Sequence, residues 1–226
     1  MKTKSSFIIA VIFLSLLLVN LQSCETEELI MGTFTDTRDG QTYETVTIGD
    51  QTWFAENLNY DTPSSWLSKN LTYGTSESWN YDNNPTNGVI YGRLYTWDAA
   101  LIACPIGNHL PTDEEWKILE MELGMSQSEA DLFGWRGSDE GFKLKSQSGW
   151  LNNGNGDNSS GFDVLPAGYR YSTGLFEHLG RYGDCWTATE ASDTTAYGRG
   201  LGTGYKQVYR GKEDKQGGSS IRCIKD

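Results

Sequence analysis

The chain of 226 residues has few of the side chains that carry common catalytic and metal-binding chemistry. It contains two histidines and four cysteines, and none of the cysteines forms a C-x-x-C pair. A zinc site is therefore not expected. The G-x-S-x-G, H-E-x-x-H and phosphate-loop motifs of common enzyme classes are absent as well. An enzyme is not expected from these absences.

Positive charge is also scarce. The chain has 18 Lys and Arg against 30 Asp and Glu, which gives a formal net charge of −12. Such a surface repels phosphate backbones and anionic headgroups, so neither nucleic acid nor a lipid surface is an expected partner. The five prolines are outnumbered by 26 glycines, and eight Trp with twelve Tyr supply aromatic side chains. This composition indicates a loop-rich secreted fold with aromatic anchors.

One long apolar run occurs, FIIAVIFLSLLLV at residues 7–19, and two lysines precede it. The run is short for a membrane span and fits the apolar region of a secretory signal. It ends in LQSC at residues 21–24, which resembles the lipobox of bacterial lipoproteins. We expect residues 1–23 to be the signal peptide and Cys24 to be lipidated, the only attachment to a membrane. An ordinary signal peptide that is cleaved nearby is the alternative.

The residues after Cys24 are acidic, with ETEE at 25–28. Residues 24–33 are expected to form a tether, and solvation alone accounts for its charge. The segment also resembles the export signals of surface lipoproteins in Bacteroidetes-type bacteria. An outer-membrane lipoprotein on the cell surface is expected, with a periplasm-facing one as the alternative. Loss of residues 1–23, which hold two lysines and no acid, changes the charge to −14. Residues 34–226 then form one domain.

Short strands are predicted at both ends of this domain. Turn signals at Asp39–Gly40 and Gly49–Asp50 divide the segment 36–58. Four more strands are predicted near the C-terminus, at 185–190, 196–201, 206–211 and 219–226.

Helical spacing predicts a short helix within 91–104, from Leu94, Trp97, Ala100 and Leu101. A second helix follows HLPTD, and a third short one begins at Ser126. The fold class is α+β, a compact domain of two main short helices, twisted antiparallel strands and long loops.

The stretch HLPTDEEW places His109 close to three acids, which suggests an acid/base cluster. However, Thr112 and Glu115 have the spacing of a helix capping box. Asp113 and Glu114 then occupy the first turn, where the helix dipole favours negative charge. A structural role is therefore expected for His109 and its neighbours.

Three cysteines remain beyond the anchor: Cys104, Cys185 and Cys223. In an oxidising compartment two of them are expected to pair, which leaves one thiol. The spacing does not select the pair.

Six segments occur in an order that resembles the Fibrobacter succinogenes major paralogous domain of lipoproteins: YGRLYTWDAA, CPIGNHLPTDEEW, KLKSQSGW, GFDVLPAGYR, CWTATE and SSIRCIKD. The resemblance covers residues 34–226 and implies a distant similarity to the C-type-lectin-like superfold. It also implies that the N- and C-terminal strands pair and that Cys104 bonds Cys223. Cys185 departs from the family pattern and is implied to be the free thiol.

Two activities of related folds do not carry over to this chain. Formylglycine-generating relatives use two reactive cysteines, whereas Cys185 and Cys223 lie far apart and the latter is implied to be bonded. Calcium-dependent lectins carry an EPN or QPD triplet followed by WND, and neither occurs here. Fold similarity by itself does not give function.

The loop LNNGNGDNSSGFD, residues 151–163, offers oxygen donors that could bind calcium: Asn153, Asn155, Asp157 and Asp163. The alternative is a surface loop that uses Asx turns and no metal. No other cofactor is expected.

The tryptophans divide into two groups. Trp53, Trp97, Trp116 and Trp186 lie on predicted apolar faces and are expected in the core. Four others lie in loop-like segments and are candidates for an exposed ligand-binding patch: Trp66, Trp79, Trp135 and Trp150.

The expected function is a non-catalytic binding or adhesion module for a glycan or an extracellular protein, with contacts from loops 60–88 and 134–160. The alternatives are an enzyme on a sulfatase-modifying-type scaffold that uses Cys185 and a structural component of the cell envelope.

Overall fold

The computed structural model describes residues 29–62 and 77–226. The predicted signal peptide, the lipidation site Cys24 and the candidate ligand residue Trp66 lie outside the described residues. Within the two described ranges, no helix has both the length and the apolar character needed to cross a membrane.

The N-terminal sheet joins both ends of the domain. Its strand order is β1 (Ile30–Thr35), β2 (Thr42–Ile48), β3 (Gln51–Phe54), β13 (Ile224–Lys225) and β6 (Asn108–His109). The pairing of β13 with β3 places Ile224 opposite Trp53. The implied pairing of N- and C-terminal strands is thereby confirmed, and both predicted turns separate strands of this sheet.

The structure corrects the predicted boundary of the tether. Strand β1 begins at Ile30 and pairs with β2 along its whole length, from Ile30 opposite Thr47 to Thr35 opposite Thr42. Residues 30–33, predicted as tether, therefore belong to the domain. The prediction missed this strand because its side chains are largely exposed, so it lacks the apolar alternation that a half-buried strand shows.

The C-terminal sheet contains the long strands. Its order is β10 (Tyr182–Glu190), β11 (Thr195–Gly202), β12 (Val208–Asp214) and β7 (Gly134–Arg136), all antiparallel. Three of the predicted C-terminal strands are confirmed as β10, β11 and β12. Of the fourth, predicted at 219–226, only Ile224–Lys225 is a strand. Two short pairs complete the strands, β4 (Ser78–Trp79) with β5 (Leu94–Tyr95) and β8 (Tyr169–Arg170) with β9 (Phe176–Glu177).

The described helices are short and more numerous than predicted. They are α1 (Pro85–Tyr91), α2 (Trp97–Ala103), α3 (Asp113–Glu122), α4 (Gln127–Ala130) and α5 (Glu140–Leu144), with a 3-10 turn at Tyr81–Asn83. The predicted capping boxes of α3 and α4 are both present. The helix predicted within 91–104 is confined to α2, because Leu94 lies in β5, and Leu101 is 42% exposed rather than buried. The fold is α+β.

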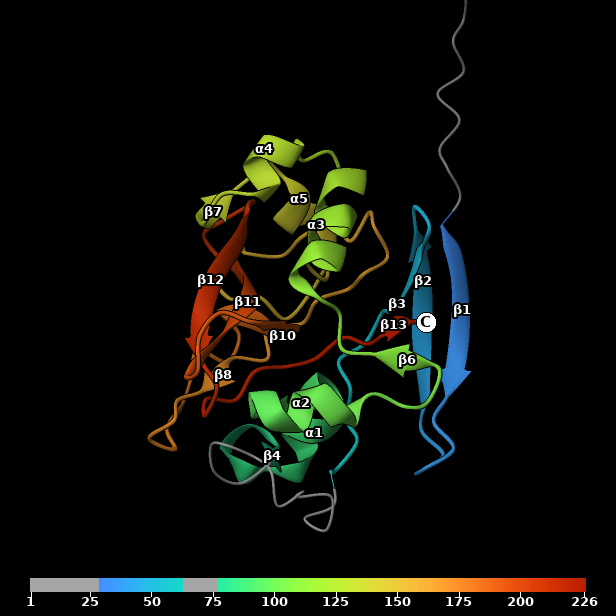
Figure 1. Ribbon diagram of the computed structural model, residues 1–226, viewed down its shortest axis with the longest axis vertical. Coiled ribbons are helices and arrows are strands. Elements are labelled where there is room, and N and C mark those ends of the chain that lie inside the picture. The colour runs from blue at the N-terminus through green and yellow to red at the C-terminus, as the bar shows by residue number, and fades with distance from the viewer. Residues whose placement is uncertain (1–28, 63–76) are drawn as a thin grey trace, which may run out of the picture.

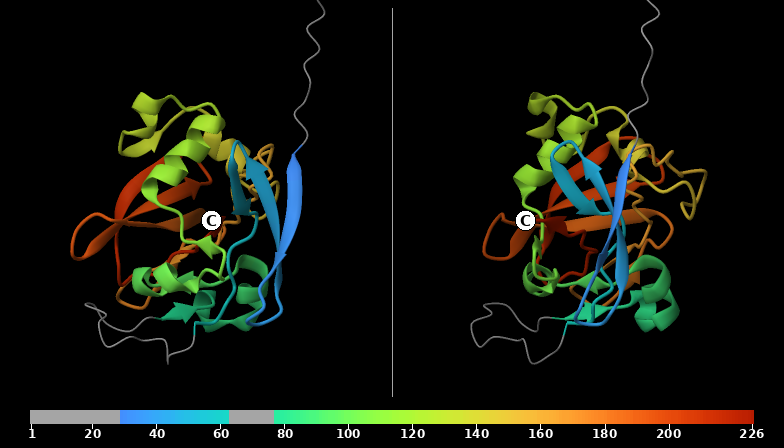
Figure 2. Two further views of the ribbon diagram at one scale, coloured as in Figure 1. Left: turned by 45° about the vertical axis from the view of Figure 1, so that its right-hand side comes forward. Right: turned by 90° about the vertical axis from the view of Figure 1, so that its right-hand side faces the viewer.

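The two larger sheets lie on opposite sides of the molecule, with α3 to α5 at one end and α1 and α2 at the other (Figure 1; Figure 2). Side chains of both sheets meet in a core around three rings. Trp53, Trp116 and Phe162 pack with centroid separations of 5.1–5.5 Å. The core predictions for Trp53, Trp97, Trp116 and Trp186 are confirmed by their burial.

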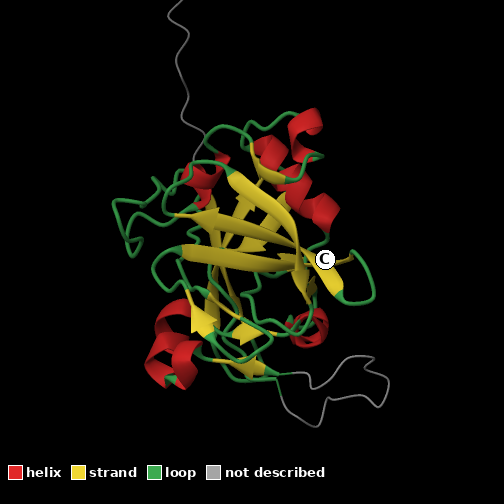
Figure 3. Cartoon of the chain, turned by 90° about the vertical axis from the view of Figure 1, so that its left-hand side faces the viewer, coloured by secondary structure: helices red, strands yellow, loops and turns green. Residues whose placement is uncertain are grey.

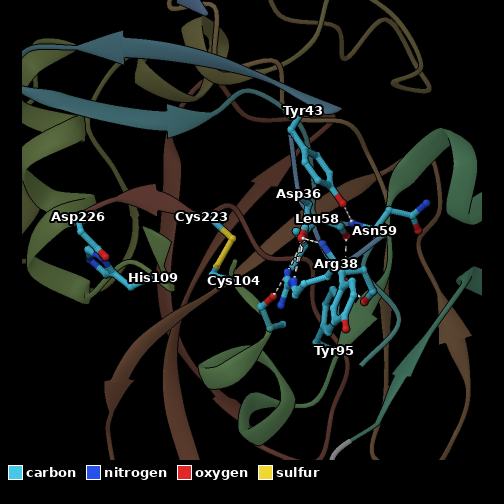
Figure 4. The surroundings of a disulfide bond; sticks show 12 residues. Asp36, Arg38, Tyr43, Leu58, Asn59, Tyr95, Cys104, His109, Cys223 and Asp226 are labelled. Carbon is cyan, nitrogen blue, oxygen red and sulfur yellow. Dashed lines mark hydrogen bonds and ion pairs between the residues drawn. A yellow bond between two sulfur atoms is a disulfide. The ribbon is translucent and has the colours of Figure 1, made fainter. Parts of the chain in front are cut away.

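A second core cluster surrounds the disulfide between Cys104 and Cys223, whose Cα atoms are 5.8 Å apart. Cys104 follows α2 and Cys223 precedes β13, so the bond ties a helix to the N-terminal sheet (Figure 4). This is the pair that the family resemblance implies. Cys185 is free and buried.

Candidate functional site

A pocket of about 490 Å³ opens on one face of the C-terminal sheet. The long strands of this sheet lie toward the viewer in Figure 3. Residues of β10, β11, β12, β7 and β8 line the pocket, together with the segment before β13. The volume is in the range of pockets that take small ligands or a few units of a polymer.

Glycines on the central strand form the floor of the pocket. Gly198, Gly200 and Gly202 alternate along β11, so all three face the same side of the sheet. A Cβ atom at Gly200 would lie 2.8 Å from Oδ1 of Asp184, and one at Gly202 would lie within 3.2 Å of three aromatic rings. Gly198 and Gly200 line the pocket, so the space above them exists because these positions lack side chains, whereas aromatic rings cover Gly202.

The sequence carries a signal for this floor. Glycine within a strand often marks the close approach of a ligand or another backbone. The segment AYGRGL was predicted only as a strand, and the alternation of its glycines was not used.

Aromatic side chains form one wall of the pocket. The rings of Trp135 and Tyr205 are stacked 3.8 Å apart with an angle of 7° between their planes, and Tyr209 lies against Trp135 at 5.4 Å. Trp135 pairs with Tyr209 across β7 and β12 and lines the pocket. Trp135 is thus a predicted ligand residue that the structure places in a pocket.

Strand β8 forms the opposite wall. Tyr169 and Tyr171 join through their hydroxyl oxygens, which are 3.1 Å apart. Between them in sequence, the Arg170 guanidinium lies 3.9 Å from the centre of the Trp79 ring. Trp79 therefore packs against Arg170 and does not itself line the pocket, whereas the predicted ligand residue Trp135 does.

Two acids lie over the glycine floor from opposite sides. Asp184 of β10 faces Gly200, and Glu213 of β12 has its Cγ 3.1 Å from a Cβ built at Gly198. Neither carboxyl forms a hydrogen bond or ion pair with any residue in the described ranges. Sequence analysis missed both acids, because only the pairing of three strands brings them to one face.

The environment disfavours the charged form of both acids. Burial raises the pKa of Asp184 well above its ordinary value, and the charge of Glu213 raises that pKa further. Burial also raises the pKa of Glu213. Buried charges in proteins are normally paired, so two carboxyls without a cation are an unusual pocket lining.

Trp150 is not part of an exposed patch, which corrects its prediction as a ligand residue. Its side chain is 5% exposed and belongs to the core. Its indole N–H donates to the Ser146 hydroxyl at 2.9 Å and to the Val164 carbonyl at 3.2 Å. A loop position can thus supply a core side chain when the backbone folds inward.

Two of the four residues predicted to bind calcium, Asn155 and Asp157, use a side-chain oxygen within their own loop. Asn155 Oδ1 accepts from the Trp150 amide, and Asp157 Oδ1 accepts from the Ser159 amide in an Asx turn. Asn153 and Asp163 have positive φ angles of 58° and 55°. In the part of the chain that the structure describes, no group of three or more His, Cys, Asp or Glu side chains could hold a metal ion. The contacts match the Asx-turn alternative.

The acids of HLPTDEEW have structural contacts. His109 lies between Glu115 Oε1, 2.9 Å from its Nε2, and Asp226 Oδ1, 2.7 Å from its Nδ1. The first of these residues to join the helix, Asp113, is buried and paired with Arg199 and Arg210. Asp113 therefore does more than match the helix dipole, which was the role that the sequence indicated.

Cys185 has no means of activation. Its thiol is 3% exposed in the core, and burial raises its pKa to about 12. A thiol is a nucleophile only as the thiolate, and burial of Cys185 disfavours that form at neutral pH. The structure therefore gives no support to a catalytic role for Cys185.

The fold and pocket define a small α+β domain with a ligand-sized site on one sheet face. The chain belongs to the family of the Fibrobacter succinogenes major domain, whose model matches residues 46–225. Neither curated proteins nor solved structures give a match to this chain.

Proposed function

We propose that this protein is a lipid-anchored binding module that holds a carbohydrate in the pocket above β11. The observation that carries the proposal is the bare glycine floor between the Trp135 wall and the two acids without protein partners. Aromatic rings stack on the apolar faces of sugars, and carboxyls bond sugar hydroxyls or amines. The C-type-lectin-like resemblance is consistent with this role.

The point at which the chain enters the described domain, β1, lies away from the sheet that carries the pocket. Strand β1, which receives the chain from the predicted lipid site Cys24, lies on the side of the molecule opposite the C-terminal sheet (Figure 1). A domain tethered through β1 would turn the pocket away from the membrane. We propose the outer membrane as its location, with the cell surface favoured by the acidic residues after Cys24.

The carbohydrate proposal is tested with the full chain, purified in detergent, on an array of glycans. Trp135→Ala should abolish the signal of any glycan that the unchanged protein binds, because the main stacking surface is lost. Phe133→Ala is the matched control, since this ring is 55% exposed and stacks on Tyr197 on the reverse face of the sheet. A blank array, or equal binding by both variants, would overturn the proposal.

A second candidate is hydrolysis of a glycosidic bond. It is favoured by the presence of two carboxyls with raised pKa values in one pocket, a pattern found at acid/base sites. Incubation of bound glycans with the protein followed by mass spectrometry tests it. Cleavage that is lost in Asp184→Asn would support a hydrolytic activity. Glycans that stay intact would support non-catalytic binding.

A further inference from the structure

The sheet pocket contains negative groups without counter-charges. Two of its acids, Asp184 and Glu213, form no ion pair within the described ranges, and Asp214 stands at the rim, where its Oδ1 accepts from the Gln216 amide. Both side chains are half-buried, and a carboxylate partly withdrawn from water without a partner is disfavoured. Either the acids hold protons when the pocket is empty, or the missing cation comes with the ligand.

The cations near the pocket form no ion pair with these acids in the described ranges. Arg170 lines the pocket, but its guanidinium stacks on Trp79 and donates to the Tyr171 carbonyl at 3.3 Å rather than to either acid, and its Nε has no hydrogen-bond partner among the described residues. Arg199 lies in the central strand, but its guanidinium pairs with Asp113 and Glu120 on the reverse face. No cation in the described ranges therefore pairs directly with Asp184 or Glu213.

The aromatic walls of the pocket can contact a positively charged group of a ligand as well as a sugar ring. Trp135, Tyr182 and Tyr209 all line the pocket, and the negative face of an aromatic ring attracts an ammonium group. Carboxylates below and aromatic faces beside a bound group are the environment that favours a primary amine over a hydroxyl or an amide.

We propose that the pocket selects an amino sugar whose amine is unacetylated, and that the ammonium group lies between the carboxylates of Asp184 and Glu213. This inference rests on the proposed function, the binding of a carbohydrate in the same pocket. Binding then forms the ion pairs that the empty pocket lacks, and no covalent step is involved.

Binding of an ammonium group in this pocket is coupled to the ionisation of its acids. Strand β8 supplies Tyr169 and Arg170 to the pocket lining, the residue after it supplies Tyr171, and β10 supplies Tyr182. From β12 it receives Tyr209, Glu213 and Asp214. Among these groups the acids are the ones that must ionise to hold an ammonium. At a pH where the free amine is already protonated, binding should therefore release protons from the acids, and affinity should fall as the pH is lowered further.

Three tetrasaccharides with the same β-1,4-linked glucose skeleton provide the test. They carry an amine, an acetamide or a hydroxyl at C2, and isothermal titration of the full chain in detergent compares their affinities. We expect the glucosamine tetramer to bind at least tenfold more tightly than the other two. Its measured enthalpy should vary with the ionisation enthalpy of the buffer, since protons are released.

Asp184→Asn and Glu213→Gln keep the shape of the pocket and remove its charge. Each should weaken the glucosamine tetramer at least tenfold and abolish its preference over the hydroxyl analogue. Glu44→Gln is the matched control, because Glu44 is an exposed residue of β2 in the other sheet. This variant should bind like the unchanged protein. Near-native circular dichroism of the two pocket variants shows that they fold.

The outcomes separate the two proposals. Equal binding of all three sugars, or stronger binding at low pH without proton release, would overturn the amine preference and leave the carbohydrate site intact. No binding of any of the three would overturn the amine preference, and the array result would then decide the carbohydrate site. Binding of Nα-acetyl-lysine amide without the glucosamine tetramer would assign the pocket to a peptide instead.

Discussion

The carboxylate of Asp113, the first residue of α3, accepts two hydrogen bonds from the guanidinium of Arg210 on β12, at 2.6 and 2.9 Å. The same carboxylate also accepts from Arg199 at 2.7 Å. Glu120 lies about two turns further along α3, on the same face of the helix. It pairs with Arg199 and with Arg136 of β7. The helix is thereby attached to the reverse face of the sheet that carries the pocket.

Removal of the Asp113 charge should destabilise the protein strongly. Asp113→Asn leaves two buried guanidinium groups without part of their counter-charge, a change that typically costs about 3–5 kcal/mol. Glu114→Gln is the matched control, because its side chain is 65% exposed and pairs only with Lys117. We expect the control to change the free energy of unfolding by less than about 1 kcal/mol. Urea unfolding of both variants measures this, and equal midpoints would contradict the role of the network.

The Asp113 carboxylate also makes the free energy of unfolding depend on pH in the acid range. Burial alone would raise the pKa of Asp113, but hydrogen bonds and charges of Arg210 and Arg199 lower it to about 2. An unfolded Asp has a pKa of about 3.9. The contribution of Asp113 is therefore complete above the unfolded value and is lost as the pH falls through the folded value. Between pH 5 and 2 the unchanged protein should lose more stability than Asp113→Asn does.

The Asp113 network also shows what sequence can and cannot predict here. The capping box of α3 was predicted because Thr112 and Glu115 are three residues apart, and this short spacing in the sequence is enough to define the motif. Arg199 and Arg210 are far from Asp113 in the chain, and no local pattern joins them. The burial of Asp113 therefore follows only from the packing of α3 on the sheet.

The pocket was partly within reach of the sequence. Trp135 was predicted as a ligand residue because it follows a glycine in a loop-like segment, and Trp150 was predicted by the same reasoning and is core. The difference lies in how the backbone turns, which composition does not report. Gly198 and Gly200 carried a usable signal, whereas Asp184 was not distinguishable from any other acid on a strand.

Loss of the disulfide should cost a large share of the stability. The bond closes a loop over a sequence separation of 119 residues. The chain-entropy model gives about 4–5 kcal/mol for loops of this size. Cys104→Ala combined with Cys223→Ala should lower the midpoint of urea unfolding accordingly. Cys185→Ala is the control for removal of a sulfur atom, and we expect a smaller loss from it, because it removes a single buried group.

His109 should give stability a dependence on pH at neutral values. Burial alone would lower the pKa of His109, but hydrogen bonds to Asp226 and Glu115 and their charges raise it. The stabilisation is therefore complete below the unfolded value of about 6.5 and is lost as the pH rises through the folded value.

The His109 prediction is checked by NMR titration of the imidazole ring. Asp226→Asn should move the pKa of His109 downward, because it removes one of the two charges beside the ring. An unchanged titration in Asp226→Asn would contradict the contact. The effect on unfolding should be modest, since the His109 side chain is 40% exposed and solvent screens its pairs.

The glycine floor gives the sharpest test of the pocket that involves no charge. Gly200→Val should leave the backbone of β11 in place, because β-branched residues favour strands. Its side chain would fill the space beside Asp184, and we expect at least a tenfold loss of affinity for the glucosamine tetramer. Gly204→Ala is the matched control, because a Cβ there meets no atom within 4 Å. If Gly200→Val folds and binds the glucosamine tetramer as tightly as Gly204→Ala does, the ligand does not occupy the space above β11.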